Sequence, residues 1–121
     1  MRYLLVGIGG GLAAVARYSA TVTVGARTFP YATLAVNVTG AFLFGLVVTL
    51  TLAGRIPTDI GTAATVGFLG AYTTFATFAW ETYSLVRGNR LAVAITYVSA
   101  SVILGVLAAG GGHLLARAID G

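Results

Sequence analysis

An all-α membrane protein with four transmembrane helices is the fold that this sequence predicts. Of its 121 residues, 58% are hydrophobic and only 8% are charged, and the mean hydropathy is +0.95. Soluble domains carry about 25% charged residues, so this chain has too little polar surface for an aqueous protein. Four apolar segments, at about residues 3–24, 31–53, 60–86 and 91–117, each reach the ~20 residues that cross a bilayer. They use nearly the whole chain, which predicts a single transmembrane domain over residues 1–121 in the cell membrane.

Short polar breaks at residues 25–30, 54–59 and 87–90 separate the segments, and each contains arginine together with Pro or Gly, which stop helices. The first segment resembles a cleavable signal peptide up to residue 16. Because its apolar run continues past Arg17, we interpret it as a retained helix. It also contains glycines at positions 7 and 11, a GxxxG spacing that lets membrane helices pack closely.

The arginines predict that the chain inserts in both orientations. With four spans, one side of the membrane carries Arg2, Arg55 and Arg117, and the other carries Arg27, Arg87 and Arg90. Orientation follows an excess of Lys and Arg on the cytoplasmic side, and here neither side has an excess. We therefore expect dual topology, and an antiparallel two-fold homodimer, since closed pairs are the commonest oligomers.

The stretch at residues 67–81 is unusual for a helix in lipid, because it combines two glycines, three threonines, three phenylalanines and a glutamate. Glycine and clustered hydroxyls allow a membrane helix to break, since hydroxyls and neighbouring helices satisfy the freed backbone groups. We expect the third helix to be broken near its middle, with free carbonyls near the bilayer midplane that could bind a cation. The alternative is a straight helix whose threonines bond the carbonyl four residues earlier.

Other polar and aromatic residues have two interpretations each. The Asn37 amide either joins two helices or faces a pore and donates to an anion without adding a charge. Phe75 and Phe78 share a helix face, where they either pack or present their positive ring edges to an anion. Tyr97 and Ser101 also share a face and offer hydroxyl donors.

Two charged residues lie within the apolar segments, Arg17 well inside the first and Glu81 near the end of the third. Arg17 either extends to the membrane interface or reaches a water-filled vestibule. Glu81, one turn after Thr77, is placed to sit in water at a pore mouth. His113 has no neighbouring ligand residue with which to form a metal site.

The sequence contains no nucleophile–base pair, phosphate loop or metal cluster, so an enzyme is not expected. The scattered arginines do not form a nucleic-acid patch. The available hydroxyl, amide and aromatic-edge groups favour a small, strongly hydrated anion.

Three motifs resemble those of the Fluc (CrcB) fluoride channels over the whole chain. They are G-G…A-R-Y in the first segment, L-A-V-N-x-x-G-x-F-x-x-G at residues 34–45 and G-F-x-G-x-x-T-T-F-x-T-F at residues 67–78. The resemblance implies antiparallel dual-topology homodimers in the cell membrane, with two fluoride pathways and a structural sodium ion at the dimer centre. It implies passive export that lowers cytoplasmic fluoride.

By motif, the resemblance also assigns residues. Sodium would be bound by the backbone carbonyls of Gly70 and Thr73. The fluoride pathway would contain Asn37, Phe75, Phe78, Thr77, Tyr97 and Ser101, and the vestibule would contain Arg17 and Glu81. One departure matters: the family's T-T-F-S-T-F is T-T-F-A-T-F here, so Ala76 removes a hydroxyl from the anion's route.

Two other functions compete with this one. Small multidrug cation/proton antiporters also have four helices and dual topology, but they need a carboxylate in the first helix, which has none here. An accessory membrane subunit without transport would need fewer polar residues on three separate helices. Substrate flux distinguishes all three.

Overall fold

The protein is entirely helical, as predicted, in a computed structural model that describes all 121 residues. The elements are α1 (Arg2–Val24), α2 (Tyr31–Leu52), α3 (Thr58–Thr62), the π-helix η1 (Ala63–Leu69), α4 (Gly70–Tyr72), α5 (Phe75–Arg87) and α6 (Leu91–Asp120). Three of them, α1, α2 and α6, are long and apolar enough to cross a membrane.

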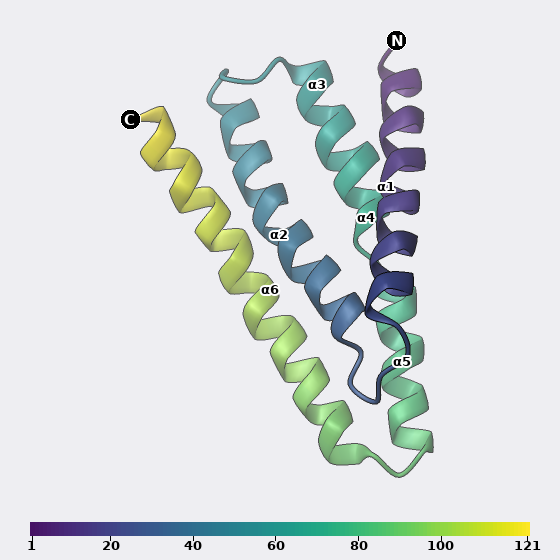
Figure 1. Cartoon of the computed structure of the whole chain (residues 1–121). Coiled ribbons are helices and arrows are strands. Elements are labelled where there is room, and N and C mark those ends of the chain that lie inside the picture. Colours follow the sequence, from purple (N-terminus) through teal and green to yellow (C-terminus); the bar gives the residue numbers. More distant parts are fainter.

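The segment expected at residues 60–86 is a succession of short helices. The path runs through α3, η1 and α4, and then through Thr73 and Thr74, whose backbones are extended (ψ of 157° and 121°), before α5 begins. In Figure 1, both chain termini and the α2–α3 turn lie at one end of the molecule, while the α1–α2 and α5–α6 turns lie at the other. The four segments therefore alternate in direction.

Proline lies at the starts of helices, and glycine or asparagine follows their ends, where the sequence predicts breaks. Pro30 and Pro57 precede the first residues of α2 and α3. Gly25, Gly54 and Asn89 adopt positive φ values of 74°, 75° and 59° just after a helix, a conformation that favours these residue types. The last helix continues to Asp120, beyond the expected end at residue 117.

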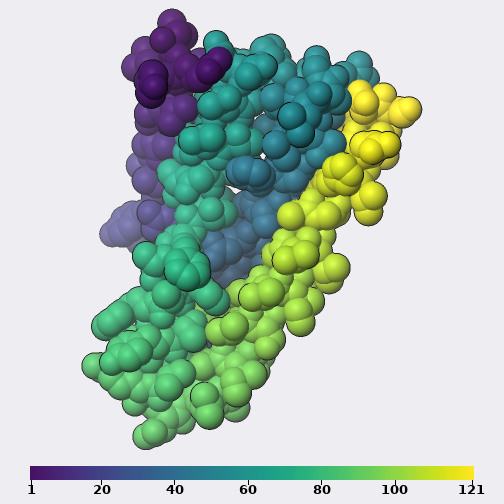
Figure 2. Space-filling view, turned by 180° about the vertical axis from the view of Figure 1, so that it is seen from behind, coloured from purple at the N-terminus to yellow at the C-terminus, as the bar shows by residue number.

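Glycines bring α2 and α6 into close contact. A Cβ on Gly45 would collide with the Ala109 carbonyl oxygen, and a Cβ on Gly112 would collide with the Phe42 carbonyl oxygen. The space-filling view shows α6 lying as a long ridge along the bundle (Figure 2). Because lipid is as apolar as the side chains, close backbone packing of this kind is what drives helix association in a membrane.

The first helix packs on η1 through Gly9 and Gly67. A Cβ on Gly67 would lie 2.7 Å from the Val6 carbonyl oxygen, and one on Gly9 would lie 3.0 Å from that of Ala63. Gly7 and Gly11, whose spacing predicts a close contact, face open space, because a Cβ added at either position would have no atom within 4 Å. The GxxxG prediction was therefore wrong for contacts within the chain.

Only 14 of the 121 residues are buried, and most large apolar side chains are exposed. Leu12, Val22, Ile103 and Leu107 are among them, each more than half exposed. In water this surface would drive aggregation, whereas in a bilayer it faces the hydrocarbon. The exposed apolar surface agrees with a membrane protein.

We expect Gly112→Ala to destabilise the fold by about 1–3 kcal/mol, because the methyl group forces α6 away from the Phe42 carbonyl. Thermal unfolding in detergent, followed by circular dichroism, measures the loss. Gly110→Ala is the matched control, since no atom lies within 4 Å of its Cβ. Equal unfolding temperatures for the two variants would contradict the close-packing role of Gly112.

Candidate functional site

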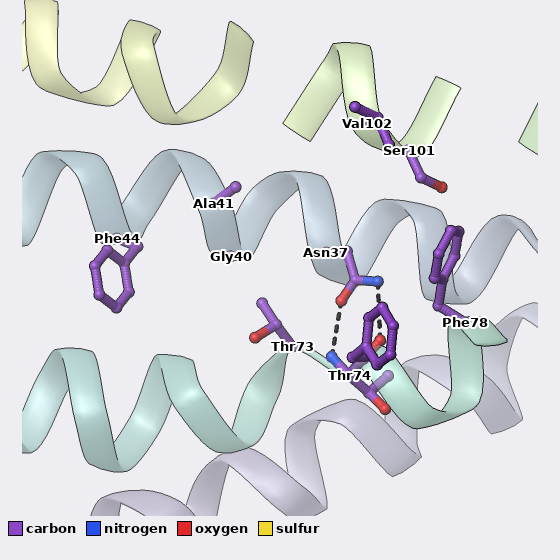
Figure 3. A pocket seen from close by; sticks show the side chains of 10 residues that line it. Asn37, Gly40, Ala41, Phe44, Thr73, Thr74, Phe78, Ser101 and Val102 are labelled. Atoms are coloured by element: carbon purple, nitrogen blue, oxygen red, sulfur yellow. Dashed lines mark hydrogen bonds between the residues drawn. The ribbon is translucent and has the colours of Figure 1, made fainter. Parts of the chain in front are cut away.

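A groove of about 430 Å³ lies between α2, the extended residues before α5, and α6. Its polar and aromatic lining includes Asn37, Thr73, Thr74, Phe75, Phe78 and Ser101. Figure 3 shows Asn37, Phe78 and Ser101 converging from three helices that are far apart in the sequence. No charged residue lines the groove. The structure thus brings four of the predicted pathway residues together: Asn37, Phe75, Phe78 and Ser101.

The Asn37 amide binds the backbone of Thr74 with both of its functional groups. Its Oδ1 accepts from the Thr74 N–H at 2.8 Å, and its Nδ2 donates to the Thr74 carbonyl at 3.2 Å (Figure 3). An amide has two N–H donors, so one remains for another acceptor. The two interpretations of Asn37 are therefore compatible: it joins α2 to the extended residues and still offers a donor to the groove.

Side chains take the N–H groups that would otherwise continue the helix. The Thr74 N–H donates to Asn37 Oδ1 and not to the Gly70 carbonyl. The Thr77 N–H donates to the Thr74 hydroxyl and not to the Thr73 carbonyl. In an unbroken α-helix these N–H groups would close the bonds to residues four earlier. Gly70 and Thr73, the two predicted sodium ligands, are thus residues whose carbonyls lose their helical donor.

The two phenylalanines have different surroundings. Phe78 packs on the fully buried Tyr97, with ring centroids 5.1 Å apart, and the Tyr97 ring also contacts Phe29 edge-on. Phe75 lies 6.1 Å from Phe78 but is 80% exposed. The rings therefore form one wall of the groove, and the outer part of that wall has no cover within the chain.

The Ser101 hydroxyl is buried and has no hydrogen-bond partner. It points toward the Phe78 ring (Figure 3). A buried hydroxyl without a partner is costly and uncommon in proteins, so Ser101 differs from the other polar residues of the groove. One turn earlier on α6, the Tyr97 hydroxyl donates to Glu81 Oε1 at 3.0 Å.

The remaining predicted site residues lie around the groove. The Thr77 hydroxyl accepts from that of Thr74 at 3.2 Å. Arg17 donates from Nε to the Ala71 carbonyl at 3.3 Å, whereas Glu81 lines a separate hollow near the α1–α2 and α5–α6 turns. The hollow lined by Glu81 does not include Arg17. Ala76 is exposed and does not line the groove.

The groups that could hold a cation are backbone oxygens. No cluster of three His, Cys, Asp or Glu side chains is present, so the chain offers no set of charged ligands for a divalent metal. Neutral carbonyl oxygens suit a hard monovalent cation. The freed carbonyls of Gly70 and Thr73 therefore fit sodium in kind, although one chain supplies only two of them.

Among the polar residues of the groove, Thr74 is the one to which the sequence interpretation gave no site role. Its hydroxyl accepts from the Thr77 N–H at 3.2 Å and so caps the first turn of α5, while its backbone holds Asn37. The signal was present, because threonine is a preferred residue immediately before a helix. The second threonine of the T-T-F motif could have been assigned this role.

The comparisons with known proteins all indicate the same family. A family model described as CrcB-like protein, Camphor Resistance (CrcB), matches residues 4–113. The chain is 46% identical over 122 residues to the fluoride-specific ion channel FluC of Solibacter usitatus, covering 97% of this chain and 99% of that relative. It is 42% identical to the fluoride-specific ion channel FluC of Acidobacterium capsulatum, covering 89% and 90%. It is 38% identical to a protein of the same name from Thermus thermophilus, covering 99% and 97%.

Proposed function

This chain belongs to the CrcB-like family, and we propose from that membership and from its groove that it is a fluoride-specific ion channel. It is a multi-pass protein of the cell membrane and not an enzyme. The channel would let fluoride leave the cell passively and so lower its cytoplasmic concentration.

The observation that carries this proposal is an uncharged groove lined by the Asn37 amide, the rings of Phe75 and Phe78, and Ser101. Fluoride is small and accepts hydrogen bonds strongly, so it needs donors to replace its water. Ser101 offers an O–H and Asn37 offers its remaining N–H. Without a fixed positive charge beside them, these donors lower the barrier to entry but do not trap the ion.

Aromatic edges would complete the pathway. The hydrogens at the edge of a phenylalanine ring carry partial positive charge, which favours contact with an anion. Phe75 and Phe78 form such a wall next to Asn37. Beyond them, Tyr97 and Thr77 would lead toward a mouth at Glu81, and Arg17, which bonds the Ala71 carbonyl, would attract the anion from a vestibule.

The active form we propose is an antiparallel homodimer in the membrane. Phe75 is 80% exposed and the groove is open on that side, so a polar pathway would meet lipid unless another surface covered it. A second copy in the opposite orientation agrees with the equal arginine counts at the two ends of the chain.

A sodium ion at the centre of this dimer would have a structural role. The carbonyls of Gly70 and Thr73 lack their usual helical donors, and two copies would supply four such oxygens. Sodium would supply the positive charge that satisfies these carbonyls away from water.

We expect purified protein in fluoride-loaded liposomes to release fluoride rapidly when a potassium ionophore is added, as measured with a fluoride electrode. Asn37→Asp should slow release by at least about tenfold, because it keeps the acceptor for Thr74 but puts a negative charge in the anion's path. Asn89→Asp is the matched control, since it makes the same change in the α5–α6 turn. Phe75→Ile should also slow release, because it removes the ring edge.

Unchanged release by Asn37→Asp would remove Asn37 from the pathway. No release by the unaltered protein, or a proton-coupled cation flux in its place, would refute the channel function itself.

Dual topology predicts labelling of both ends of the molecule from outside the cell. The chain has no cysteine, so Gly121→Cys and Asn89→Cys, at opposite ends of the molecule, each introduce a single thiol. A membrane-impermeant maleimide applied to intact cells should label about half of each population. Full labelling of one variant and none of the other would mean a fixed orientation.

Sodium should raise the unfolding temperature of the protein relative to N-methylglucamine at equal ionic strength, because a ligand that binds only the folded state stabilises it. Gly40→Ala should abolish this difference, since its methyl group would displace the Thr73 side chain. Gly105→Ala, whose Cβ meets no atom within 4 Å, should preserve it. The sodium site would be ruled out if the unaltered protein unfolded at the same temperature in both salts.

A further inference from the structure

A second hollow, of about 330 Å³, lies at the end of the molecule formed by the α1–α2 and α5–α6 turns. We name it the arginine hollow after the two arginines in its lining. Its polar lining contains Arg27, Thr28, Trp80, Glu81, Ser84 and Arg90. It shares no lining residue with the groove. The hollow is thus a separate feature, built from both turns and from α5.

The two arginines of the hollow have no acidic partner. The salt bridges of the protein are at the other end, where Arg2 binds Asp59 at 2.7 Å and Arg55 binds Asp120 at 2.8 Å. Arg27 uses only its Nε, which donates to the Val24 carbonyl at 3.4 Å. Its terminal nitrogens therefore remain available for a ligand.

The carboxylate in the hollow does not neutralise these arginines. Glu81 is directed to α6, where it accepts from the Tyr97 hydroxyl at 3.0 Å, and it forms no salt bridge. With two arginines and one carboxylate, the hollow has a net positive charge. The hydroxyls of Thr28 and Ser84 add neutral donors to its wall. This set of groups is complementary to a phosphate.

The position of the hollow corresponds to the headgroup layer of a bilayer. Trp80, in its lining, is 62% exposed and pairs with Tyr83 at a centroid distance of 5.7 Å. Tryptophan and tyrosine at the ends of membrane helices lie at headgroup level. Exposed apolar side chains, including Leu91 and Ile95 on α6, continue from this end along the bundle. A phosphate in the hollow could therefore be attached to acyl chains that lie against the helix.

We propose that the arginine hollow binds the headgroup of an acidic phospholipid. Arg27 and Arg90 bind the phosphate, with Thr28 and Ser84 as additional donors. Basic residues at a membrane surface attract anionic lipids, which is why an acidic headgroup is favoured over a zwitterionic one. Glu81 lines this hollow and also marks the proposed mouth of the ion pathway, so a bound headgroup would lie beside that mouth.

Trp80 provides a built-in probe, because it is the only tryptophan in the chain and it lines the hollow. The protein is reconstituted in mixtures of phosphatidylglycerol and phosphatidylcholine in which one of the two lipids is brominated near the headgroup. Bromine quenches tryptophan fluorescence at short range, so the quenching curves give the relative binding constant of the two lipids at the hollow. The measurement does not depend on transport, and failure of the lipid site is therefore distinguishable from failure of the channel function.

We expect phosphatidylglycerol to bind more tightly than phosphatidylcholine, by roughly fivefold for each arginine. In the double variant Arg27→Gln/Arg90→Gln, the binding constant of phosphatidylglycerol relative to phosphatidylcholine should fall close to one. Arg87→Gln is the matched control, because Arg87 lies in the last turn of α5 and does not line the hollow. This control should retain the preference.

Equal quenching by the two lipids in the unaltered protein would overturn the proposal, as would a preference that the double variant retains. A preference that Arg87→Gln loses as completely as the double variant would also overturn it, since general surface charge would then suffice. Inorganic phosphate provides the last test. Displacement of brominated phosphatidylglycerol by millimolar phosphate would make the hollow a free-phosphate site, whereas persistence of quenching supports a lipid.

Discussion

The paired hydrogen bonds between the Asn37 side chain and the Thr74 backbone hold the part of the structure on which the site depends. Within a membrane, an extended residue has no water to satisfy its N–H and carbonyl, so another part of the protein must do so. Asn37 satisfies both groups of Thr74 at once. The Thr74 hydroxyl then caps α5. The consequence is an interruption that can persist at membrane depth and that leaves the carbonyls of Gly70 and Thr73 without their helical donors.

Glycine determines how the helices meet around this interruption. In lipid, apolar side chains gain little by associating with one another, so helices associate where their backbones can approach closely. Gly112 places α6 directly on the Phe42 carbonyl of α2, and Gly67 places η1 on Val6 of α1. The contact with α6 carries Ser101 and Tyr97 toward α5, so the same packing that stabilises the bundle also forms the second wall of the groove.

The two ends of the bundle have equal numbers of arginines but different electrostatics. At one end Arg2 and Arg55 are paired with aspartates, whereas at the other end Arg27 and Arg90 have no acidic partner. Insertion depends on the number of basic residues, which acidic residues alter little. Binding of an anion depends on the net local charge. A chain can therefore have no preferred orientation and still differ at its two ends in what it attracts.

The sequence by itself determined the helical membrane class, the approximate limits of the apolar segments and the uncharged, hydroxyl-rich composition of the groove. These depend on local properties: hydropathy over about 20 residues, and the effect of Pro and Gly on the adjoining backbone. Its motifs also pointed to three residues that line the groove, Asn37, Phe75 and Phe78, and the helical spacing of Tyr97 and Ser101 pointed to a fourth, Ser101.

Only the tertiary structure decided which partner each polar group takes. Asn37 bonds a backbone 37 residues away, Tyr97 bonds Glu81, and Arg17 contacts Ala71 and not the hollow that Glu81 lines. The physical reason is that a hydrogen bond requires two groups within about 3 Å and in line. Local sequence fixes which face of a helix a side chain occupies, but the distance to its partner depends on how closely the glycines allow separate helices to approach.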